Sequence, residues 1–203
     1  HSYASGSPDA GFYIGQCYPC DAIVNNVISE NNGLGYSGTN SGGSLYIISS
    51  VFRNNKGGLA PNTLDSELLP PERETFIIGN LIENNNNNDA PATKSTYLSF
   101  GNGVIIAGGN NNIIKNNVIA NHDLYGVILT AAADVNYWPA HGNRVEDNLI
   151  LSSNRADMAI SGVSNLGNCF KGNYFNTSIP PGLQSLNNCD AGYIPLSSDL
   201  SGM

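Results

Sequence analysis

The stretch NNVISENN, residues 25–32, holds two apolar residues between two pairs of asparagines, and five related stretches follow it. They read SSVFRNN at 49–55, GNLIENN at 79–85, NNVIANH at 116–122, DNLILSSN at 147–154 and GNYFNTS at 172–178. Asn tolerates the left-handed backbone of tight turns, and stacked Asn side chains can form hydrogen-bonded ladders. We therefore interpret each stretch as a corner between two short strands, repeated along a solenoid.

The apolar residues keep fixed places around these corners. If the second residue of each stretch is taken as an anchor, the anchors are Asn26, Ser50, Asn80, Asn117, Asn148 and Asn173. The residues two places after the anchors are Ile28, Phe52, Ile82, Ile119, Ile150 and Phe175, and those three places before them are Ile23, Ile47, Ile77, Ile114, Val145 and Phe170. We expect these side chains to stack in the core and the Asn anchors to form a ladder. The spacing of the anchors suits coils of about 22 to 25 residues with insertions.

A second element lies between the corners, a short apolar strand that usually begins with glycine. It reads GFYI from 11, GLGY from 33, GGLA from 57, GVII from 103, GVIL from 126 and MAIS from 158. Each coil thus holds about three short strands separated by Asn and Gly turns, with no amphipathic helical pattern. This predicts an all-β fold, a parallel β-helix of about six to seven coils.

Over roughly residues 11–178, these corner and strand motifs resemble the right-handed parallel β-helix repeat family. This pectate-lyase-like superfamily includes pectate lyases, polygalacturonases, mannuronan epimerases and secreted bacterial proteins of undefined activity. The resemblance implies a right-handed coil and, often, an extracellular polysaccharide partner. The paired Asp motifs of polygalacturonases and the Asp-Pro-His-Asp type of motif of epimerases are absent from the sequence. The resemblance therefore specifies the architecture rather than an activity.

Charged residues are scarce in the 203-residue chain, at 12% against the usual 25% or so. A hydrophobic content of 40%, regularly placed, argues against disorder. The formal net charge is −8 with only eight Lys and Arg, which argues against nucleic acid and anionic membranes as partners. No apolar run approaches the roughly 18 residues of a membrane span.

The corner pattern ends near Ser178. We therefore divide the chain into a β-helix domain, residues 1–178, and an irregular C-terminal tail, residues 179–203, which we expect to cover the last coil. The sequence begins at His1 rather than Met, so we treat it as a mature or excised piece and leave the number of preceding coils open. An uncapped end would expose strand edges, which makes end-to-end self-association a further candidate property.

The four cysteines form two groups, Cys17 with Cys20 and Cys169 with Cys189. At about 4.8 Å per coil, the groups should lie roughly 25 Å apart, which excludes a shared zinc site. A Cys169–Cys189 disulfide would pin the tail and contribute about 3 kcal/mol. A redox role for the CYPC motif is weighed against a structural pair, which we prefer because a strand follows instead of a helix. Disulfides favour an extracellular or cell-surface location.

The position of the chemistry is less clear. The resemblance implies acids and bases on outward positions of one sheet, yet the Gly-opened strands hold none. We therefore expect function on three insertions, where long loops on a rigid coil concentrate it. Residues 59–75 and 131–143 should emerge at one corner and residues 86–102 at the opposite corner. Together they predict a groove over Leu59, residues 104–107 and residues 127–130.

The insertions also supply candidate catalytic residues. Glu67, Arg73 and Glu74 could form a catalytic or ligand-binding cluster, and a solvated salt-bridged loop is the alternative that we prefer. His141, with Asp134 near it in sequence, could act as a general base. Hydrolysis needs two carboxylates at a set spacing, and elimination or epimerisation needs a base with a group that stabilises negative charge. The sequence identifies neither set firmly.

The candidate ligand-binding residues are aromatic. Tyr137 and Trp138 lie side by side on one insertion and Tyr97 lies on another, where their rings could stack on a sugar. Packing of Trp138 under its own loop is the alternative that we prefer. His122 stands where other corners have Asn, which indicates a structural role.

Metal sites have little support in the sequence. Three His and two Met do not suit a copper site, and the nonapeptide of calcium β-rolls is absent. We expect no resident cofactor or metal, with a single Ca²⁺ held by loop carboxylates as the alternative.

We therefore expect a secreted or cell-surface module that binds a polysaccharide or cell-surface glycan, or has a structural or adhesive role, without catalysis in this chain. The alternative is a polysaccharide lyase, epimerase or glycoside hydrolase with catalytic residues on its loops.

Overall fold

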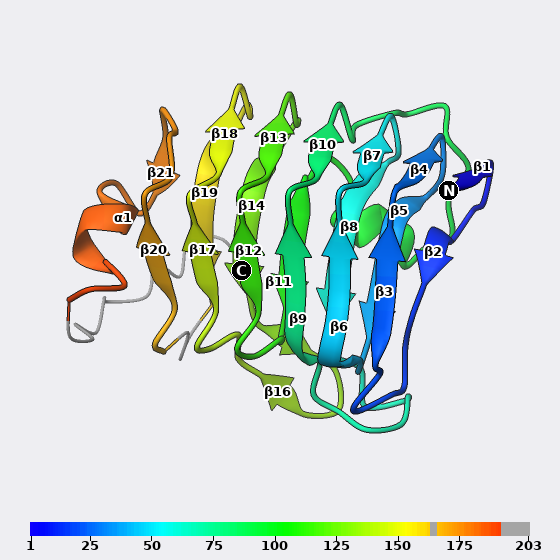
Figure 1. Cartoon of the computed structure of the whole chain (residues 1–203), viewed down its shortest axis with the longest axis horizontal. Helices are drawn as coiled ribbons and strands as arrows, with labels where there is room; N and C mark the ends of the chain where they lie inside the picture. Colours follow the sequence, from blue (N-terminus) through cyan, green and yellow to red (C-terminus); the bar gives the residue numbers. More distant parts are fainter. Residues whose placement is uncertain (163–165, 192–203) are drawn as a thin grey trace.

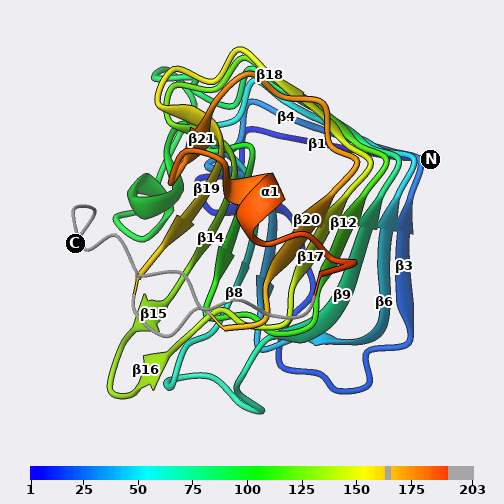
Figure 2. The same ribbon diagram turned by 90° about the vertical axis from the view of Figure 1, so that its left-hand side faces the viewer.

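The computed structural model describes residues 1–162 and 166–191. Within them the chain winds into stacked coils that contribute strands to three parallel sheets (Figure 1). Viewed from one end, the sheets form three sides around a shared apolar core (Figure 2). The structure is thus the all-β parallel β-helix that the Asn and Gly patterns predict.

Each sheet takes one strand from successive coils. Sheet A has six strands in the order β1 (Ser2–Ser5), β4 (Val27–Glu30), β7 (Val51–Arg53), β10 (Leu81–Glu83), β13 (Val118–Ala120) and β18 (Leu149–Leu151). Sheet B has seven, in the order β2 (Ala10–Tyr13), β5 (Leu34–Thr39), β8 (Gly57–Asn62), β11 (Val104–Ala107), β14 (Tyr125–Thr130), β19 (Ala156–Ser161) and β21 (Ser178–Ile179). Sheet C has six, in the order β3 (Ala22–Asn25), β6 (Gly42–Ile48), β9 (Arg73–Ile78), β12 (Ile113–Lys115), β17 (Arg144–Glu146) and β20 (Cys169–Lys171). The Gly-opened strands of the sequence are those of sheet B.

Within residues 1–162 and 166–191, three smaller elements lie outside these sheets. A 3₁₀ helix, η1 (Thr96–Ser99), lies in the 86–102 insertion, and an antiparallel hairpin, β15 (Ala132–Ala133) with β16 (Tyr137–Trp138), lies in the 131–143 insertion. A short helix, α1 (Leu183–Leu186), follows the last coil (Figure 1).

The strand register stacks apolar side chains in rows inside the coil, because side chains alternate between the two faces of a strand. The inward row of sheet C consists of Val24, Ile47, Ile77, Ile114, Val145 and Phe170. Sheet A contributes Phe52, Ile82, Ile119 and Ile150, and sheet B contributes Tyr36, Leu59, Val104, Val127 and Met158. Apart from Val24, all of these side chains are fully buried. From the second coil onward the predicted core residues therefore face inward, with Phe175 packed at the edge of the core.

The first coil differs from the prediction by one residue. Ile23 and Ile28 are 65% and 38% exposed, whereas Val24 and Val27 are buried. Asn26 has a φ of 56° and forms the turn itself, so Val27 takes the ladder position. The assignments of Ile23 and Ile28 to the core and of Asn26 to the ladder were therefore wrong. Both registers offer apolar residues here, and a slip of one residue moves every side chain to the other face.

The later corners between sheets C and A share one arrangement. The second residue of each corner pair, the anchor, points inward and forms hydrogen bonds along the solenoid axis. Asn80 donates its backbone N–H and its Nδ2 to Oδ1 of Asn117, at 2.9 and 3.0 Å. Asn117 does the same to Asn148, and Asn148 to Asn173. The first residue of the pair takes the left-handed backbone, as at Asn116 with a φ of 55°. The left-handed turn and the ladder, which a single Asn was expected to provide, are thus provided by two neighbouring residues.

The other two edges of the solenoid carry similar ladders. The second half of the opening stretch begins one of them, in which Asn32 donates to Asn55 and Asn55 donates to Asn85. His122 continues this ladder, because its Nδ1 accepts the backbone N–H of Asn85 at 3.4 Å. Burial lowers the pKa of His122 to about 4, so the ring is neutral and can accept this bond.

The third ladder runs through Asn112, Asn143 and Asn168. Its upstream end is Glu72, a fully buried residue whose Oε2 accepts the Nδ2 of Asn112 at 2.8 Å. Burial raises the pKa of Glu72 to about 8, against bonds from Thr75 and Asn112 that lower it. The side chain is therefore largely protonated at neutral pH.

Both predicted disulfides are present, Cys17–Cys20 and Cys169–Cys189. The second one lies beside α1, whose Leu183 is fully buried against the core. Gln184 of the same helix ends the first ladder, because its Oε1 accepts both donors of Asn173. Leu183, Gln184 and Cys189 of the expected tail thus contact the last coil, whereas its first residue, Ile179, belongs to β21 of sheet B; residues 192–203 lie outside the described residues.

Candidate functional site

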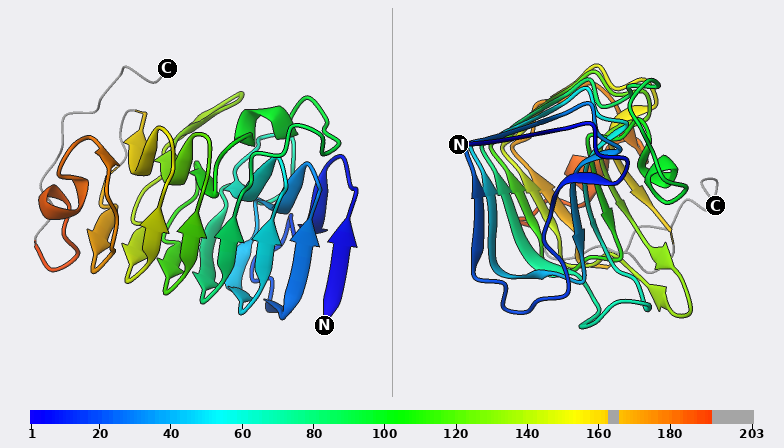
Figure 3. Two further views of the ribbon diagram at one scale, coloured as in Figure 1. Left: turned by 90° about the horizontal axis from the view of Figure 1, so that it is seen from above. Right: turned by 90° about the vertical axis from the view of Figure 1, so that its right-hand side faces the viewer.

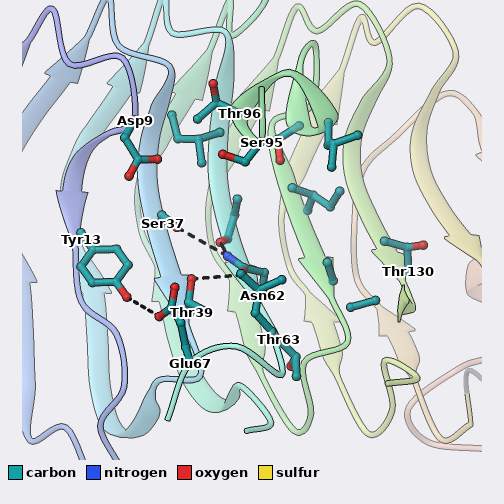
Figure 4. A pocket seen from close by; sticks show the side chains of 18 of the residues that line it. Asp9, Tyr13, Ser37, Thr39, Asn62, Thr63, Glu67, Ser95, Thr96 and Thr130 are labelled. Atoms are coloured by element: carbon teal, nitrogen blue, oxygen red, sulfur yellow. Dashed lines mark hydrogen bonds between the residues drawn. The ribbon is translucent and has the colours of Figure 1, made fainter. Parts of the chain in front are cut away.

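A groove with a volume of about 410 Å³ crosses the outward face of sheet B (Figure 4). Its floor consists of outward residues of β5, β8, β11 and β14, namely Ser37, Thr39, Ala60, Asn62, Ile105, Ala107 and Thr130. None of these residues is ionisable. The groove lies where the three insertions predicted it, although Leu59 and Val104 point into the core instead of forming the floor.

One wall comes from the 86–102 insertion, through Ser95, Thr96, Leu98 and Ser99. Beneath it lies Lys56, which is only 2% exposed. Its Nζ donates to the carbonyl of Asn88 at 2.6 Å and to that of Asn87 at 3.3 Å, and lies 5.2 Å from the centre of the Tyr97 ring. A buried ammonium group requires such partners, so Lys56 fastens this wall to the coil.

The opposite wall comes from the loop after β8 and from the β15–β16 hairpin, which both leave the same edge of sheet B (Figure 3). Asp65 joins them. Its carboxylate accepts the backbone N–H and the Nδ2 of Asn136, each at 2.7 Å, and Nε1 of Trp138 at 3.1 Å. The backbone N–H of Asp65 donates to Asp134 at 2.9 Å. The bonds from Asn136, the backbone one first, lower the pKa of Asp65.

The ionisable residues of the groove lie at one end. Asp9 precedes β2 and Tyr13 is its last residue; the Tyr13 hydroxyl points toward Glu67 of the loop after β8, and Asp9 lies farther along the same side of the groove (Figure 4). Tyr13 donates its hydroxyl to Oε2 of Glu67 at 2.7 Å. Burial raises the pKa of Tyr13, and the bond to Glu67 and its charge add to this. The pair can donate and accept hydrogen bonds at the groove end.

The structure separates the candidate catalytic residues. Only Glu67 lines the groove. Arg73 lies against Tyr18, with its guanidinium carbon 3.8 Å from the ring centre, and Glu74 accepts the Tyr18 hydroxyl at 2.8 Å. His141 is exposed and pairs with Asn110. The Glu67, Arg73 and Glu74 cluster is therefore divided, because the chain turns away from the groove before β9 begins.

The candidate aromatic residues lie on the insertions, beside the side chains that line the groove. Tyr97 is 59% exposed on η1, next to the lining residues Thr96 and Leu98. Tyr137 is 43% exposed on β16, and Trp138 is partly buried with its Nε1 bonded to Asp65. Trp138 therefore contacts both its own hairpin, through Ala132, and the neighbouring 59–75 insertion, through Asp65.

Sequence reasoning missed the lining residues that come from the first two strands of sheet B. These residues are Asp9 and Tyr13, from β2 and the bend before it, and Leu34, Ser37 and Thr39 from β5. Their signal is the two-residue alternation of the Gly-opened strands, which marks every second residue as outward once the register is known. Within the described residues, no group of three or more His, Cys, Asp or Glu could hold a metal ion.

No protein-family model and no curated protein matches the chain. Among solved structures, the chain is similar to the A-module of the Azotobacter vinelandii mannuronan C-5 epimerase AlgE4, with a TM-score of 0.62 and 15% sequence identity. The match covers 87% of this chain and 55% of that one, so this chain spans about half the length of the module. At this identity the likeness shows the fold, a right-handed parallel β-helix.

Proposed function

We propose that this protein is a glycan-binding β-helix module whose ligand lies in the groove on sheet B, without catalysis in this chain. The observation that carries the proposal is the composition of the groove floor. Hydroxyl and amide groups from Ser37, Thr39, Asn62 and Thr130 alternate there with the apolar side chains of Ala60, Ile105 and Ala107. Such a surface matches a sugar, which presents hydroxyl groups at its edges and apolar C–H faces.

The charges of the groove favour a neutral glycan over a polyuronate. The carboxyl side chains that line it are Asp9 and Glu67, and no Lys, Arg or His lies among the lining residues. The chain as a whole carries a formal net charge of −8. An acidic glycan would be repelled unless a cation such as Ca²⁺ bridged the two, and this repulsion would weaken at high salt.

The aromatic residues of the insertions extend the proposed site. Tyr97 and Tyr137 are exposed at positions next to lining residues on opposite walls. In this proposal their rings contact sugar units that project beyond the groove. Trp138 acts indirectly by holding the hairpin through Asp65.

We also place the protein outside the cell in this proposal. Two disulfides support an oxidising compartment. The similar solved structure is a module of a mannuronan epimerase, and a polysaccharide is a partner that an extracellular module would meet. Among the described residues, no helix is long and apolar enough to cross a membrane.

A second candidate function is catalysis on the bound glycan, and one observation favours it. Tyr13 and Glu67 form a 2.7 Å hydrogen-bonded pair at the end of the groove, where a phenol and a carboxylate could serve as acid and base. Lyase, epimerase or hydrolase activity that is lost in Glu67→Gln, with binding retained, would establish this function.

The first experiment is a glycan-array screen with and without Ca²⁺, followed by calorimetry on the hits. Ala107→Trp places a large side chain on the groove floor and should reduce affinity at least about tenfold. Val118→Trp is the matched control, because Val118 is an outward strand residue of the same coil on sheet A. Equal affinity in both variants would remove the groove from the proposal, whereas unsaturated or shortened products would favour the catalytic alternative.

A further inference from the structure

The outward face of sheet C carries an apolar patch that is separate from the groove. Two neighbouring rows run across its first four strands. One row consists of Ile23, Tyr46, Phe76 and Ile113, and the other contains Ile48 and Ile78. Tyr46 and Phe76 stack with their ring centres 4.8 Å apart. We call these six residues the sheet C patch.

The regular backbone makes this patch flat. The strands β3, β6, β9 and β12 pair in parallel, so the patch extends about 19 Å along the solenoid axis. Ile23 is 65% exposed, and the other five side chains are partly exposed. A contiguous apolar area of this kind commonly marks an interaction site.

The charge distribution indicates which partner can approach. The strands of sheets A and C and the corner between them carry the basic residues Arg53, Arg73, Lys115, Arg144 and Lys171 and the acidic residues Glu30, Glu74, Glu83, Glu146 and Asp147. Asp190 pairs with Lys171 at the same surface, so this side of the molecule is nearly neutral and most of the net charge of −8 belongs to the rest of the chain. Two copies of an acidic protein repel least through their least charged sides.

We infer that the sheet C patch is a self-association surface, through which two copies of this chain pack face to face as a reversible dimer. A two-fold axis that lies in the interface, parallel to the strands between β6 and β9, brings like rows together. Tyr46 then faces Phe76 of the second copy, Ile48 faces Ile78, and Ile23 faces Ile113. Sheets packed in this way lie about 10 Å apart.

The same arrangement keeps two basic residues of sheet C out of the interface, while Lys115, which follows Ile78 in the second row, lies at its edge opposite Asn25 of the second copy. The solenoids run antiparallel, so β17 and β20, with Arg144 and Lys171, extend past the first coil of the second copy. A parallel arrangement would instead pack β17 against β17 and β20 against β20 of the second copy, and so bring the charged side chains of Arg144 and Lys171 into the interface, which costs desolvation energy. The patch is smaller than the roughly 800 Å² per partner of standard interfaces, so the dimer should be weak and depend on concentration.

Sedimentation equilibrium of the full chain over a range of concentrations tests the proposal. We expect a monomer–dimer equilibrium in the wild type and at least about tenfold weaker association in Phe76→Lys, because a lysine would be buried against apolar residues. Val118→Lys on sheet A is the matched control and should associate like the wild type, since Val118 is an outward strand residue that is 42% exposed. Circular dichroism confirms that both variants fold.

Cysteine cross-linking tests the arrangement. Ile23→Cys combined with Ile113→Cys should give a covalent dimer with a short bis-maleimide reagent, which can span facing sheets, while each single variant should not. A wild type that stays monomeric at all concentrations would overturn the proposal. So would a dimer that Phe76→Lys leaves unchanged, or a covalent dimer from Ile23→Cys alone. If the wild type is monomeric and Phe76→Lys instead weakens adsorption to microcrystalline cellulose, the patch serves a solid polysaccharide and the dimer is excluded.

Discussion

Sheets B and C are built from the same coils, yet their outward faces differ. Sheet B is bordered by insertions that rise on both sides and enclose a groove of about 410 Å³. The first four strands of sheet C instead present the flat, apolar sheet C patch. The insertions emerge next to sheet B because the chain is longest between β8 and β9, between β10 and β11 and between β14 and β17.

The difference separates two kinds of residue. The ladders and the core rows support both faces equally, since every coil contributes strands to both sheets and shares the same corners. The contacts of Asp65 and Lys56 support only the walls of the groove. A substitution in the ladders or the core rows should therefore affect both faces, and a substitution in the insertions should affect the groove alone. The four predictions below test this separation, from the largest expected effect to the smallest.

Replacing a ladder residue should damage both faces. Asn117→Ala removes a side-chain amide whose Oδ1 accepts the backbone N–H and the Nδ2 of Asn80 and whose Nδ2 donates to Asn148 and to the carbonyl of Ile77, so each of these buried groups loses a partner. We expect the free energy of unfolding to fall by about 4 kcal/mol, since each such group costs about 1–3 kcal/mol. Denaturant melts measure the change.

The neighbouring residue is the control for this prediction. Asn116 has a φ of 55° and is exposed, so Asn116→Gly keeps the turn and should change the stability by less than about 0.5 kcal/mol. Equal losses in the two variants would mean that the turn, and not the ladder, holds the corner.

Removing the Cys169–Cys189 disulfide should free the cap on the last coil. We expect a double change to Ser to lower the free energy of unfolding by about 3 kcal/mol, because the bond closes a loop with a sequence separation of 20. The same change at Cys17 and Cys20, with a separation of 3, should cost about 2 kcal/mol by the same reasoning. Hydrogen exchange in α1 should rise only in the first variant. Protection of α1 in both variants would show that Leu183 and Gln184 hold the cap unaided.

Glu72 should make the stability depend on pH. Its pKa is raised by burial to about 8 in the folded protein, so between the usual pKa of a glutamate and pH 8 the folded state binds more protons than the unfolded state. The free energy of unfolding should therefore fall as the pH rises, by roughly 2 kcal/mol from pH 5.5 to pH 7, at about 1.36 kcal/mol per unit. Denaturant melts at several pH values measure this slope.

Glu72→Gln removes the proton equilibrium and keeps the shape of the side chain. Its stability should be flatter over the same pH range than that of the wild type. An identical slope in both proteins would assign the dependence to other groups.

The smallest expected effect belongs to the insertions. Asp65→Ala removes the bonds to Asn136 and Trp138, so the hairpin should loosen and glycan affinity should fall about tenfold, a difference of about 1.4 kcal/mol. Melting of the coil should hardly change. Glu83→Ala on sheet A is the control, because it removes the same charge away from the groove. A loss of coil stability in Asp65→Ala would contradict the separation, because it would show that the insertions also stabilise the coil.

Much of the fold could be read from the chain. From the second coil on, an apolar residue before and after each anchor specified the inward rows, because one register alone places them all in the core. In the first coil the same reasoning gave the wrong inward residues. Ile23 and Val24 are both apolar, as are Val27 and Ile28, so either register places an apolar residue in the core. The separate roles of Asn116 and Asn117 could not be predicted from the sequence either, because Asn suits both a left-handed turn and a ladder.

The site was predicted in part. The order of strands and insertions gave the position of the groove, since loops that follow equivalent strands emerge at the same edge of a sheet. It did not give the lining, because Tyr13 and Glu67 are 54 residues apart and meet through the fold. Glu74 showed the opposite error, as it is close to Glu67 in sequence but bonds to Tyr18.

The sequence by itself determined the coil, the corners and the length of each insertion. A solenoid repeats one local unit, so the pattern of side chains within a single coil fixes how all coils stack. The tertiary structure alone decided which insertion residues meet, how Asp65 and Lys56 fasten the walls, and that Glu72 is buried at the end of a ladder. These contacts join segments from different coils, and their energies depend on distances that no local pattern encodes.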